Sequence, residues 1–252
     1  MIEGAPAEWV LGIAVIFARV GGVFFIAPGL SSARIPVRIR VFMALALSLA
    51  LSPLLIEEAK AAVEARAPAD LLAVLGTETM IGFLIGFLAR LLLMALEFIA
   101  TGIAQASGLG GIPGTGLEGN EPSPAVATLF TTTAVTIIFL ADLHYEILRG
   151  MVGSYTVIPA GGALDVRLAL VSVSERAGQA FAIALRLGAP FMIYSVIVNF
   201  AVGITNKLTP QLPVFFIALP MITAGGLLMM ALTIREIMLA FKDAFEQLAF
   251  AL

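Results

Sequence analysis

The chain has 252 residues, of which 60% are hydrophobic and 12% are charged, and its mean hydropathy is +1.06. Soluble domains carry about a quarter charged residues, so this composition indicates an integral membrane protein. The net charge of −3 argues against nucleic acid as a partner, because binding a polyanion requires clustered Lys and Arg. Cysteine is absent, which excludes disulfides, thiolate metal sites and thiol nucleophiles.

The first apolar segment, residues 9–28, carries Arg19 near its middle. Its strong hydrophobes contribute roughly −3 to −6 kcal/mol to insertion, against roughly +3 kcal/mol for a central arginine. The segment is therefore able to enter a bilayer, but Arg19 then needs a protein partner or a water-filled cavity. Acidic residues precede the segment and it exceeds signal-peptide length, so we expect no cleaved secretory signal.

A turn rich in Gly, Ser and Pro at residues 28–36 leads through a basic cluster into the charge-free segment 41–56. That segment is short for a straight membrane span, which needs about twenty residues. Residues 57–70 carry mixed charge, and we expect them to form a polar connector.

Residues 71–107 predict one long helix or a helical pair with a small and polar stripe along one side. Two of the stripe's glycines are four residues apart, which lets another helix backbone approach closely. The stripe favours a face that packs on protein or lines a wet lumen over one that faces lipid. Pairing of its Glu with an Arg inside the helix bundle is an equally open alternative. The stripe comprises Glu78, Gly82, Gly86, Arg90, Glu97, Thr101 and Gln105.

Residues 107–124 form a loop in which glycine and proline make up half of the sequence. We expect neither helix nor strand there, because glycine loses the most backbone entropy on ordering and proline removes a donor. One interpretation is a flexible surface connector. The other is a plug or constriction at membrane depth, where irregular backbone must be covered by protein or line a cavity.

The apolar run 125–141 is rich in threonine and ends beside His144, the one histidine of the chain. No second residue of metal-binding type stands at a helical spacing from this histidine. We therefore interpret His144 as an interfacial or capping residue.

The C-terminal part of the chain predicts a helical hairpin followed by an amphipathic tail. Residues 177–205 form an apolar helix with Arg186 and a proline inside it, and residues 206–207 mark a turn. The uncharged segment 208–234 is long enough to span a membrane, but its prolines predict a kinked or interrupted helix. The tail, residues 235–252, either lies on the membrane surface or packs on a partner.

These segments together predict an all-α integral membrane protein of helical hairpins, with about six hydrophobic segments, kinked helices and one domain over residues 1–252. Lys and Arg counts favour neither side of the membrane consistently from loop to loop. The apolar segments are therefore not all expected to be ordinary bilayer crossings, and the chain is expected to be part of a larger helical assembly.

The run NKLTPQLPVFFIALP at residues 206–220 resembles the signature hairpin of the FliR family of flagellar export-gate proteins, whose virulence-type members are called SctT. Further matches are Arg19 before the turn at Pro28, ARIPVRIRVFMALALS at 33–48, and HYEILRGMVGSYTVIPAGG at 144–162. Together these stretches extend over nearly the whole chain.

This resemblance implies a non-enzymatic subunit of the type III protein export gate, in the bacterial inner membrane at the flagellar basal body. FliP-like and FliQ-like subunits would complete the channel, with FlhB-like and FlhA-like proteins and membrane lipid nearby. Exported unfolded protein would be a transient substrate, and loop 107–124 would close the channel until that substrate passes. The equivalent SctT subunit of an injectisome is the alternative.

The resemblance and the residue patterns together give two sets of candidate residues, and neither a cofactor nor a metal is expected. The expected channel plug comprises Gly108, Gly110, Gly111, Ile112, Pro113, Gly114 and Leu117. Residues expected at subunit contacts or the lumen are Arg19, Glu78, Gly82, Gly86, Arg90, Glu97, Arg186, Pro210, Gln211, Pro213, Phe215 and Phe216.

Two other classes of protein fit the residues less well. An intramembrane enzyme needs a nucleophile and a base within reach, but the chain has no Cys, a single His144 at a segment end, and Ser107 without a GxSxG frame. A secondary transporter is suggested by two apolar segments that each contain Arg and Pro. It lacks carboxylates at corresponding midspan positions of two halves.

Overall fold

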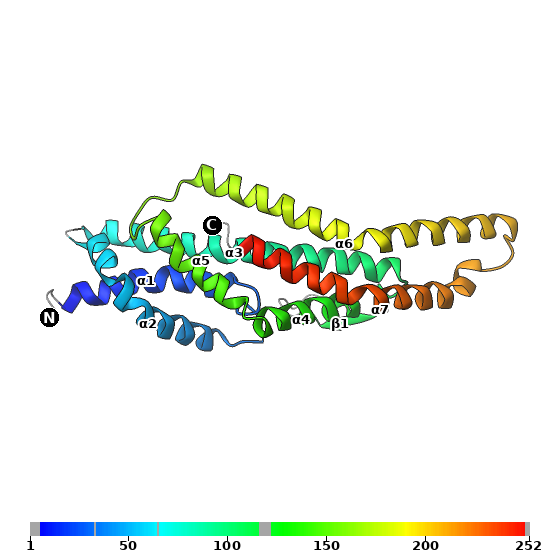
Figure 1. Ribbon diagram of the computed structural model, residues 1–252, viewed down its shortest axis with the longest axis horizontal. Coiled ribbons are helices and arrows are strands. Elements are labelled where there is room, and N and C mark those ends of the chain that lie inside the picture. The colour runs from blue at the N-terminus through cyan, green and yellow to red at the C-terminus, as the bar shows by residue number, and fades with distance from the viewer. Residues whose placement is uncertain (1–5, 33, 65, 116–121, 250–252) are drawn as a thin grey trace. The chain divides into compact units, whose positions relative to one another are not determined.

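The computed structural model describes residues 6–32, 34–64, 66–115 and 122–249, and nearly all of them are helical (Figure 1). Five described helices are long and apolar enough to cross a membrane, and α4 with α5 forms a sixth such segment if the two count as one broken span. This confirms the predicted all-α membrane fold with about six hydrophobic segments. The elements are α1 Pro6–Ile26, α2 Val37–Val63, α3 Pro68–Ala106, β1 Pro113–Thr115, β2 Pro122–Pro124, α4 Ala125–Leu140, α5 His144–Val157, α6 Val166–Leu208 and α7 Val214–Ala249.

The helices divide into two compact units, and each is described by itself. Unit 1 contains residues 1–91, 141–176 and 246–252, and unit 2 contains residues 92–140 and 177–245. Helices α3, α6 and α7 are long enough to contribute to both units.

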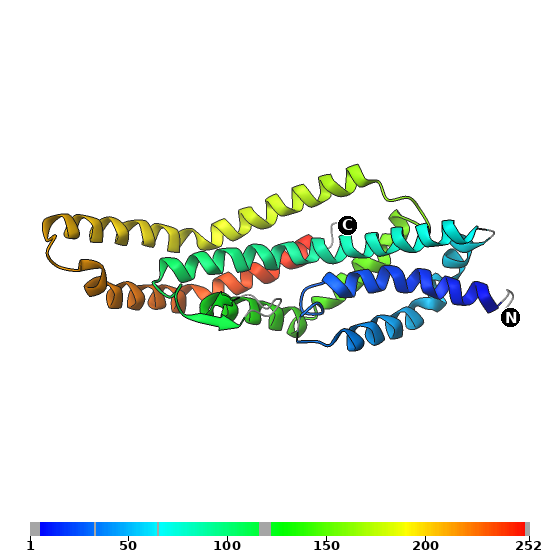
Figure 2. The ribbon, with the colours of Figure 1, turned by 180° about the vertical axis from the view of Figure 1, so that it is seen from behind.

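In unit 1, α1 and α2 form an antiparallel hairpin, which Figures 1 and 2 show from opposite sides. Gly29 in the connecting turn has a φ of 77°, a conformation that glycine adopts without steric cost. Helix α1 also contacts α3, and the contact depends on two facing glycines. A Cβ atom at Gly22 would lie 2.6 Å from the Thr79 carbonyl oxygen, and one at Gly82 would meet the Arg19 carbonyl oxygen.

Helix α2 is longer than the sequence analysis predicted. It runs from Val37 to Val63 and continues through Pro53, so the expected polar connector at 57–70 is wrong in its first half. The helix continues because apolar residues keep a helical spacing past the charged positions, with Ile56, Ala59 and Val63 all buried. Its 27 residues span ~40 Å, so the segment is not short.

In unit 2, the hairpin of α6 and α7 turns at residues 209–213, later than predicted (Figure 1). The expected turn at 206–207 is wrong, because Asn and Lys are compatible with a helix and α6 continues through them to Leu208. Pro210 and Pro213 instead lie in the turn, where a fixed φ and a missing donor are tolerated. Pro220 is the one proline inside α7.

The predicted tail at 235–252 is not a separate element, because α7 continues without a break to Ala249. Its apolar side chains Ile237, Phe241 and Phe245 are buried within the chain. Phe241 lines a small void with Leu92 of α3. Both interpretations of the tail, on the membrane surface or on a partner, are therefore wrong for this apolar face.

The glycine-rich loop contains two short strands, so the expectation of no strand between residues 107 and 124 is wrong. β1 and β2 pair antiparallel, with Gly114 opposite Ser123. The pair ends at α4, where the Ala125 N–H donates to the Ile112 carbonyl at 2.9 Å. Proline is tolerated in such a two-stranded ribbon, because each strand has an edge that needs no donors.

We predict that Gly82→Ala destabilises unit 1 by about 1–3 kcal/mol, because the new Cβ forces α1 and α3 apart. Gly76→Ala is the matched control on the same helix, since a Cβ there meets no atom within 4 Å. The control gains roughly 0.5–1 kcal/mol from the better helix former. Thermal unfolding of the purified protein in detergent measures both, and equal midpoints for the two variants would contradict the prediction.

Candidate functional site

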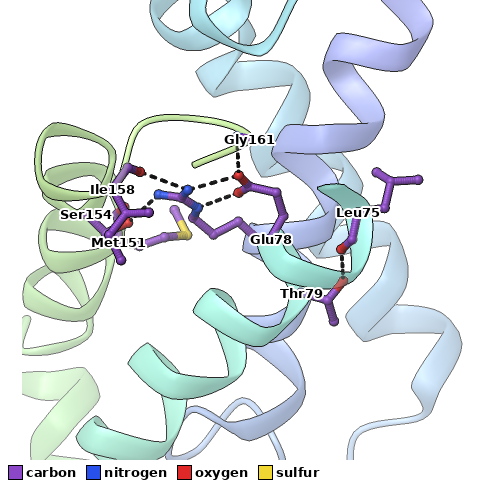
Figure 3. A network of polar contacts seen from close by, with 8 residues as sticks. Leu75, Glu78, Thr79, Met151, Ser154, Ile158 and Gly161 are labelled. Carbon is purple, nitrogen blue, oxygen red and sulfur yellow. Dashed lines mark hydrogen bonds and ion pairs between the residues drawn. The ribbon is translucent and has the colours of Figure 1, made fainter. Parts of the chain in front are cut away.

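A buried ion pair joins α1 and α3 in unit 1 (Figure 3). The side chains of Arg19 and Glu78 are both 0% exposed. The Arg19 Nε lies 2.6 Å from Oε2 of Glu78, and Nη2 lies 3.1 Å from Oε1. Two parallel N–H···O bonds of this kind fix the orientation of both side chains.

The remaining donors of Arg19 bind α5 and the chain that follows it. Nη1 donates to the Ser154 hydroxyl at 3.0 Å, and Nη2 also donates to the Ile158 carbonyl at 3.0 Å. The guanidinium carbon lies 3.8 Å above the centre of the Tyr155 ring, a cation–π geometry. Each of the three guanidinium nitrogens of Arg19 therefore has a hydrogen-bond acceptor, and the Tyr155 ring covers one face of the group.

Glu78 also accepts a bond from the segment between α5 and α6. The Gly161 N–H donates to Oε1 of Glu78 at 2.8 Å (Figure 3). Gly161 has a φ of 73°, and a Cβ there would lie 2.8 Å from the Ala62 Cβ. Glycine is required at this position for both reasons.

The arrangement stabilises structure and does not expose a reactive group. A buried charge pair tolerates its desolvation only when hydrogen bonds satisfy its remaining atoms, and here α5 and residues 158–161 supply those bonds. Of the two alternatives for the stripe, pairing of its glutamate with an arginine inside the chain is the one that the structure shows for Glu78 and Arg19.

The other stripe residues of unit 1 face α1 or the turn that follows it. A Cβ on Gly86 would lie 3.0 Å from the Val23 carbonyl oxygen, so this glycine allows a close approach of the two helices. The Arg90 Nη1 donates to the Ser31 hydroxyl at 3.4 Å. Glu97 lies further along α3, in unit 2, and is half-buried.

The glycine-rich loop begins with a Schellman motif at the end of α3. The Gly108 N–H donates to the Gln105 carbonyl at 3.1 Å, and the Leu109 N–H donates to the Ala104 carbonyl at 2.8 Å. Gly108 has a φ of 70°, and Leu109 is buried. This combination satisfies the last carbonyls of the helix and explains why α3 ends here.

The predicted plug residues have different surroundings in unit 2. Gly108 contacts α7, Gly110 lies against the side chain of Gln105, and Gly114 lies against Thr128 of α4. Ile112 is 51% exposed, and a Cβ on Gly111 would meet no atom within 4 Å. Pro113 begins β1, and Leu117 lies outside the described residues.

The predicted residues of the α6–α7 hairpin are exposed in the chain by itself. Arg186 is exposed on α6, and the rings of Phe215 and Phe216 meet edge to face with centroids 6.0 Å apart. Pro210, Gln211 and Pro213 are exposed in the turn. These six residues belong to unit 2, whereas the buried pair belongs to unit 1.

Sequence reasoning missed the partners of the two best-defined contacts. Ser154 is 135 residues from Arg19 and Gly161 is 83 residues from Glu78, so no local spacing connects them. The one available signal was that Arg19 needed a partner. A third missed contact joins Ser107 to Gly226 of α7.

The described residues contain no group of three or more His, Cys, Asp or Glu side chains that could hold a metal ion. His144 is the first residue of α5, with its ring centroid 4.3 Å from that of Tyr145. The structure does not place it as a cap, because the N-cap position is Leu143 and no side-chain cap bond forms there.

Comparison with known proteins gives one family and relatives along the whole chain. Residues 10–248 match the model of "Bacterial export proteins, family 1". The "Flagellar biosynthetic protein FliR" of Caulobacter vibrioides is 30% identical over 247 residues, covering 97% of this chain and 96% of the relative. The protein of the same name from Aquifex aeolicus is 27% identical over 95% of this chain and 91% of its own length. "Yop proteins translocation protein T" of Yersinia pestis is 29% identical over 67% of this chain and 65% of its own length.

We predict that Arg19→Ala costs about 3–5 kcal/mol of unit 1 stability, because it leaves Glu78 as an uncompensated buried charge. Arg149→Ala is the matched control, since its bond to Glu146 lies at a surface where Arg149 is 72% exposed, and it costs less than about 1 kcal/mol. Thermal unfolding in detergent and the amount of protein in the membrane measure the difference. A loss of similar size in both variants would show that the buried pair is not special.

Proposed function

The chain belongs to the bacterial export proteins, family 1, and from that membership we propose that it is a non-enzymatic subunit of the flagellar type III protein export gate. The whole chain, residues 1–252, works as one gate domain in this proposal. The names of its relatives, flagellar biosynthesis and protein translocation proteins, support an export role.

The main support for this proposal is the length of the exposed apolar surface on α6. Within unit 2, exposed large apolar residues on α6 extend from Phe181 to Leu208, ~40 Å along the helix axis. The hydrocarbon core of a bilayer is about 30 Å thick, so lipid does not cover this surface in an ordinary crossing. Protein neighbours must cover the rest, which is what a subunit of a helical assembly requires.

We propose that these neighbours are FliP-like and FliQ-like subunits, with FlhB-like and FlhA-like export proteins and lipid at the margins. The exposed Arg186 on α6 supports a protein or aqueous neighbour over lipid at that position. The exposed turn residues Pro210, Gln211 and Pro213 and the exposed α7 residues Phe215 and Phe216 lie on the same hairpin and would contact such subunits.

Loop 107–124 is the proposed plug of the channel, through which exported unfolded protein passes transiently. Its described parts support this role, because both ends are anchored. The Schellman motif fixes residues 107–109 on α3, and β1 and β2 lead into α4. Irregular backbone at membrane depth is stable when it is covered or lines a cavity.

The proposed location is the bacterial inner membrane at the flagellar basal body. The Caulobacter relative matches 97% of this chain and the Yersinia translocation protein matches 67%, which favours the flagellar system. The equivalent subunit of an injectisome is the second candidate, because the Yersinia protein is nearly as similar where it aligns.

Shortening the loop is expected to open the gate to small solutes. Gly114 and Ser123 are paired across the ladder, so a two-residue turn is able to join them. A variant with Gly-Gly in place of residues 115–122 keeps both anchors and removes the tip. We expect several-fold higher solute entry into cells that contain the assembled gate.

The control for this variant replaces residues 116–121 with glycine and serine at unchanged length. It distinguishes the effect of a shorter loop from the effect of changed loop residues. Co-purification of the partner subunits verifies that both variants assemble. Unchanged solute entry through an assembled, shortened gate would refute the plug.

Co-purification tests the need for protein neighbours. Val196 on α6 is 69% exposed in the chain by itself. We expect Val196→Glu to abolish recovery of two small hydrophobic partner proteins with the tagged chain, because a carboxylate would be buried unpaired at the interface. Arg167→Glu, at an exposed and already charged position at the start of α6, serves as the control and is expected to retain them. An active, monodisperse chain without partners would count against the assembly.

A further inference from the structure

The base of the loop lies against α7 at a position where only glycine fits. Ser107 is fully buried, and its side chain faces Gly226. A Cβ at Gly226 would lie 2.6 Å from the Ser107 hydroxyl oxygen and 2.8 Å from its Cα. Cβ contacts under 3 Å essentially do not occur, so any other residue at 226 must displace the loop base or the helix.

The next loop residue extends the same contact by two helical turns. Gly108 holds its left-handed φ of 70° directly on α7. A Cβ there would lie 3.2 Å from Leu219 Cδ1 and 3.2 Å from Thr223 Oγ1. Two consecutive loop residues therefore contact the stretch of α7 from Leu219 to Gly226.

A tyrosine from α6 fixes this stretch of α7 from the other side. The Tyr194 hydroxyl donates to the Ile222 carbonyl at 2.7 Å, one turn before Gly226. Its oxygen lies 2.5 Å from where a Cβ on Gly225 would be, so this approach also requires glycine. Gly226 thus allows the loop base to approach the α7 backbone, and Gly225 allows the α6 tyrosine to approach it.

Helix α7 lacks one backbone hydrogen bond close to this contact. Pro220 lies inside α7 and has no N–H, so the carbonyl four residues earlier loses its usual helical partner. The residues before Pro220 on α7 include the exposed Phe215 and Phe216. A molecule that binds Phe215 and Phe216 therefore acts on α7 close to Pro220, where the helix lacks a hydrogen bond, and close to the contact with the loop base.

We propose that Gly225 and Gly226 of α7 form a glycine seat that holds the loop in its closed position, with Ser107 and Tyr194 as positioning residues. The inference rests on the proposed function of loop 107–124 as the plug. Because the loop base contacts bare helix backbone, a small shift of α7 removes the contact and releases the loop. A partner or an exported chain that binds the exposed part of the hairpin acts on the loop through α7.

The test is the solute leak of the intact gate that carries Gly226→Ala. The new methyl group pushes Ser107 away from α7 and lowers the closed-to-open ratio of the loop about tenfold. Because the closed loop still predominates, this appears as an about tenfold higher leak per assembled gate. Gly102→Ala is the matched control in the same unit, since a Cβ at that α3 position meets no atom within 4 Å. It is expected to leak no more than the wild type.

Two further variants test the geometry of the seat. Adding Ser107→Gly to Gly226→Ala removes two of the three contacting atoms, so the double variant is expected to leak less than Gly226→Ala alone. Tyr194→Phe keeps the ring and removes the bond to Ile222. It is expected to give a smaller increase in leak than Gly226→Ala, with normal assembly.

The outcomes separate this inference from the proposed function. If the shortened loop leaks but Gly226→Ala leaks no more than Gly102→Ala, the glycine seat is wrong and the plug stands. If the shortened loop itself does not leak, the plug is wrong. Should Gly226→Ala fail to assemble, Tyr194→Phe decides, and a leak equal to that of the wild type overturns the seat.

Discussion

The Arg19–Glu78 pair is the interaction on which unit 1 depends. Both side chains are fully buried, and their hydrogen bonds reach α1, α3, α5 and the segment after α5. A charge pair in this position is stable only while every one of those segments is in place, because each supplies a bond that offsets desolvation. If any one of these segments of unit 1 is misplaced, the buried pair loses a hydrogen bond and the misfolded arrangement is destabilised.

Close helix contact through glycine is the second constraint, and it recurs in both units. Gly22 and Gly82 bring α1 against α3 in unit 1, and Gly226 brings α7 against the loop base in unit 2. Helices in a membrane gain little from burying apolar side chains, since lipid is equally apolar. Tight backbone approach and buried polar bonds supply the specificity instead.

The two units differ in how much of their apolar surface the chain covers by itself. Arg19 and Glu78 are enclosed in unit 1, whereas the α6–α7 hairpin of unit 2 leaves Phe200, Phe216 and Leu232 about 70% exposed. A buried core in unit 1 combined with an exposed apolar hairpin in unit 2 fits a subunit whose unit 1 is stable by itself and whose hairpin needs neighbouring proteins to cover it. The proposed plug begins where the hairpin contacts the loop, so assembly and gating would involve the same helix.

The sequence by itself determined the class of protein, its helices and its family resemblance. Composition predicted membrane helices, the run at 206–220 matched one family, and Arg19 inside an apolar segment required a partner. Those features are local, so they are readable from composition, spacing and motif. Local rules failed where helices continued through charged residues, as in α2, and where prolines set the turn at 209–213.

Only the tertiary structure decided which residues meet. Glu78 is 59 residues from Arg19 and Ser154 is 135 residues away, and Ser107 meets Gly226 across a similar separation. Such pairs depend on the rotation and register of whole helices, which helical periodicity leaves undetermined. The sequence showed that a buried arginine needs a partner and that a glycine-rich loop needs support, and packing selected the atoms that provide them.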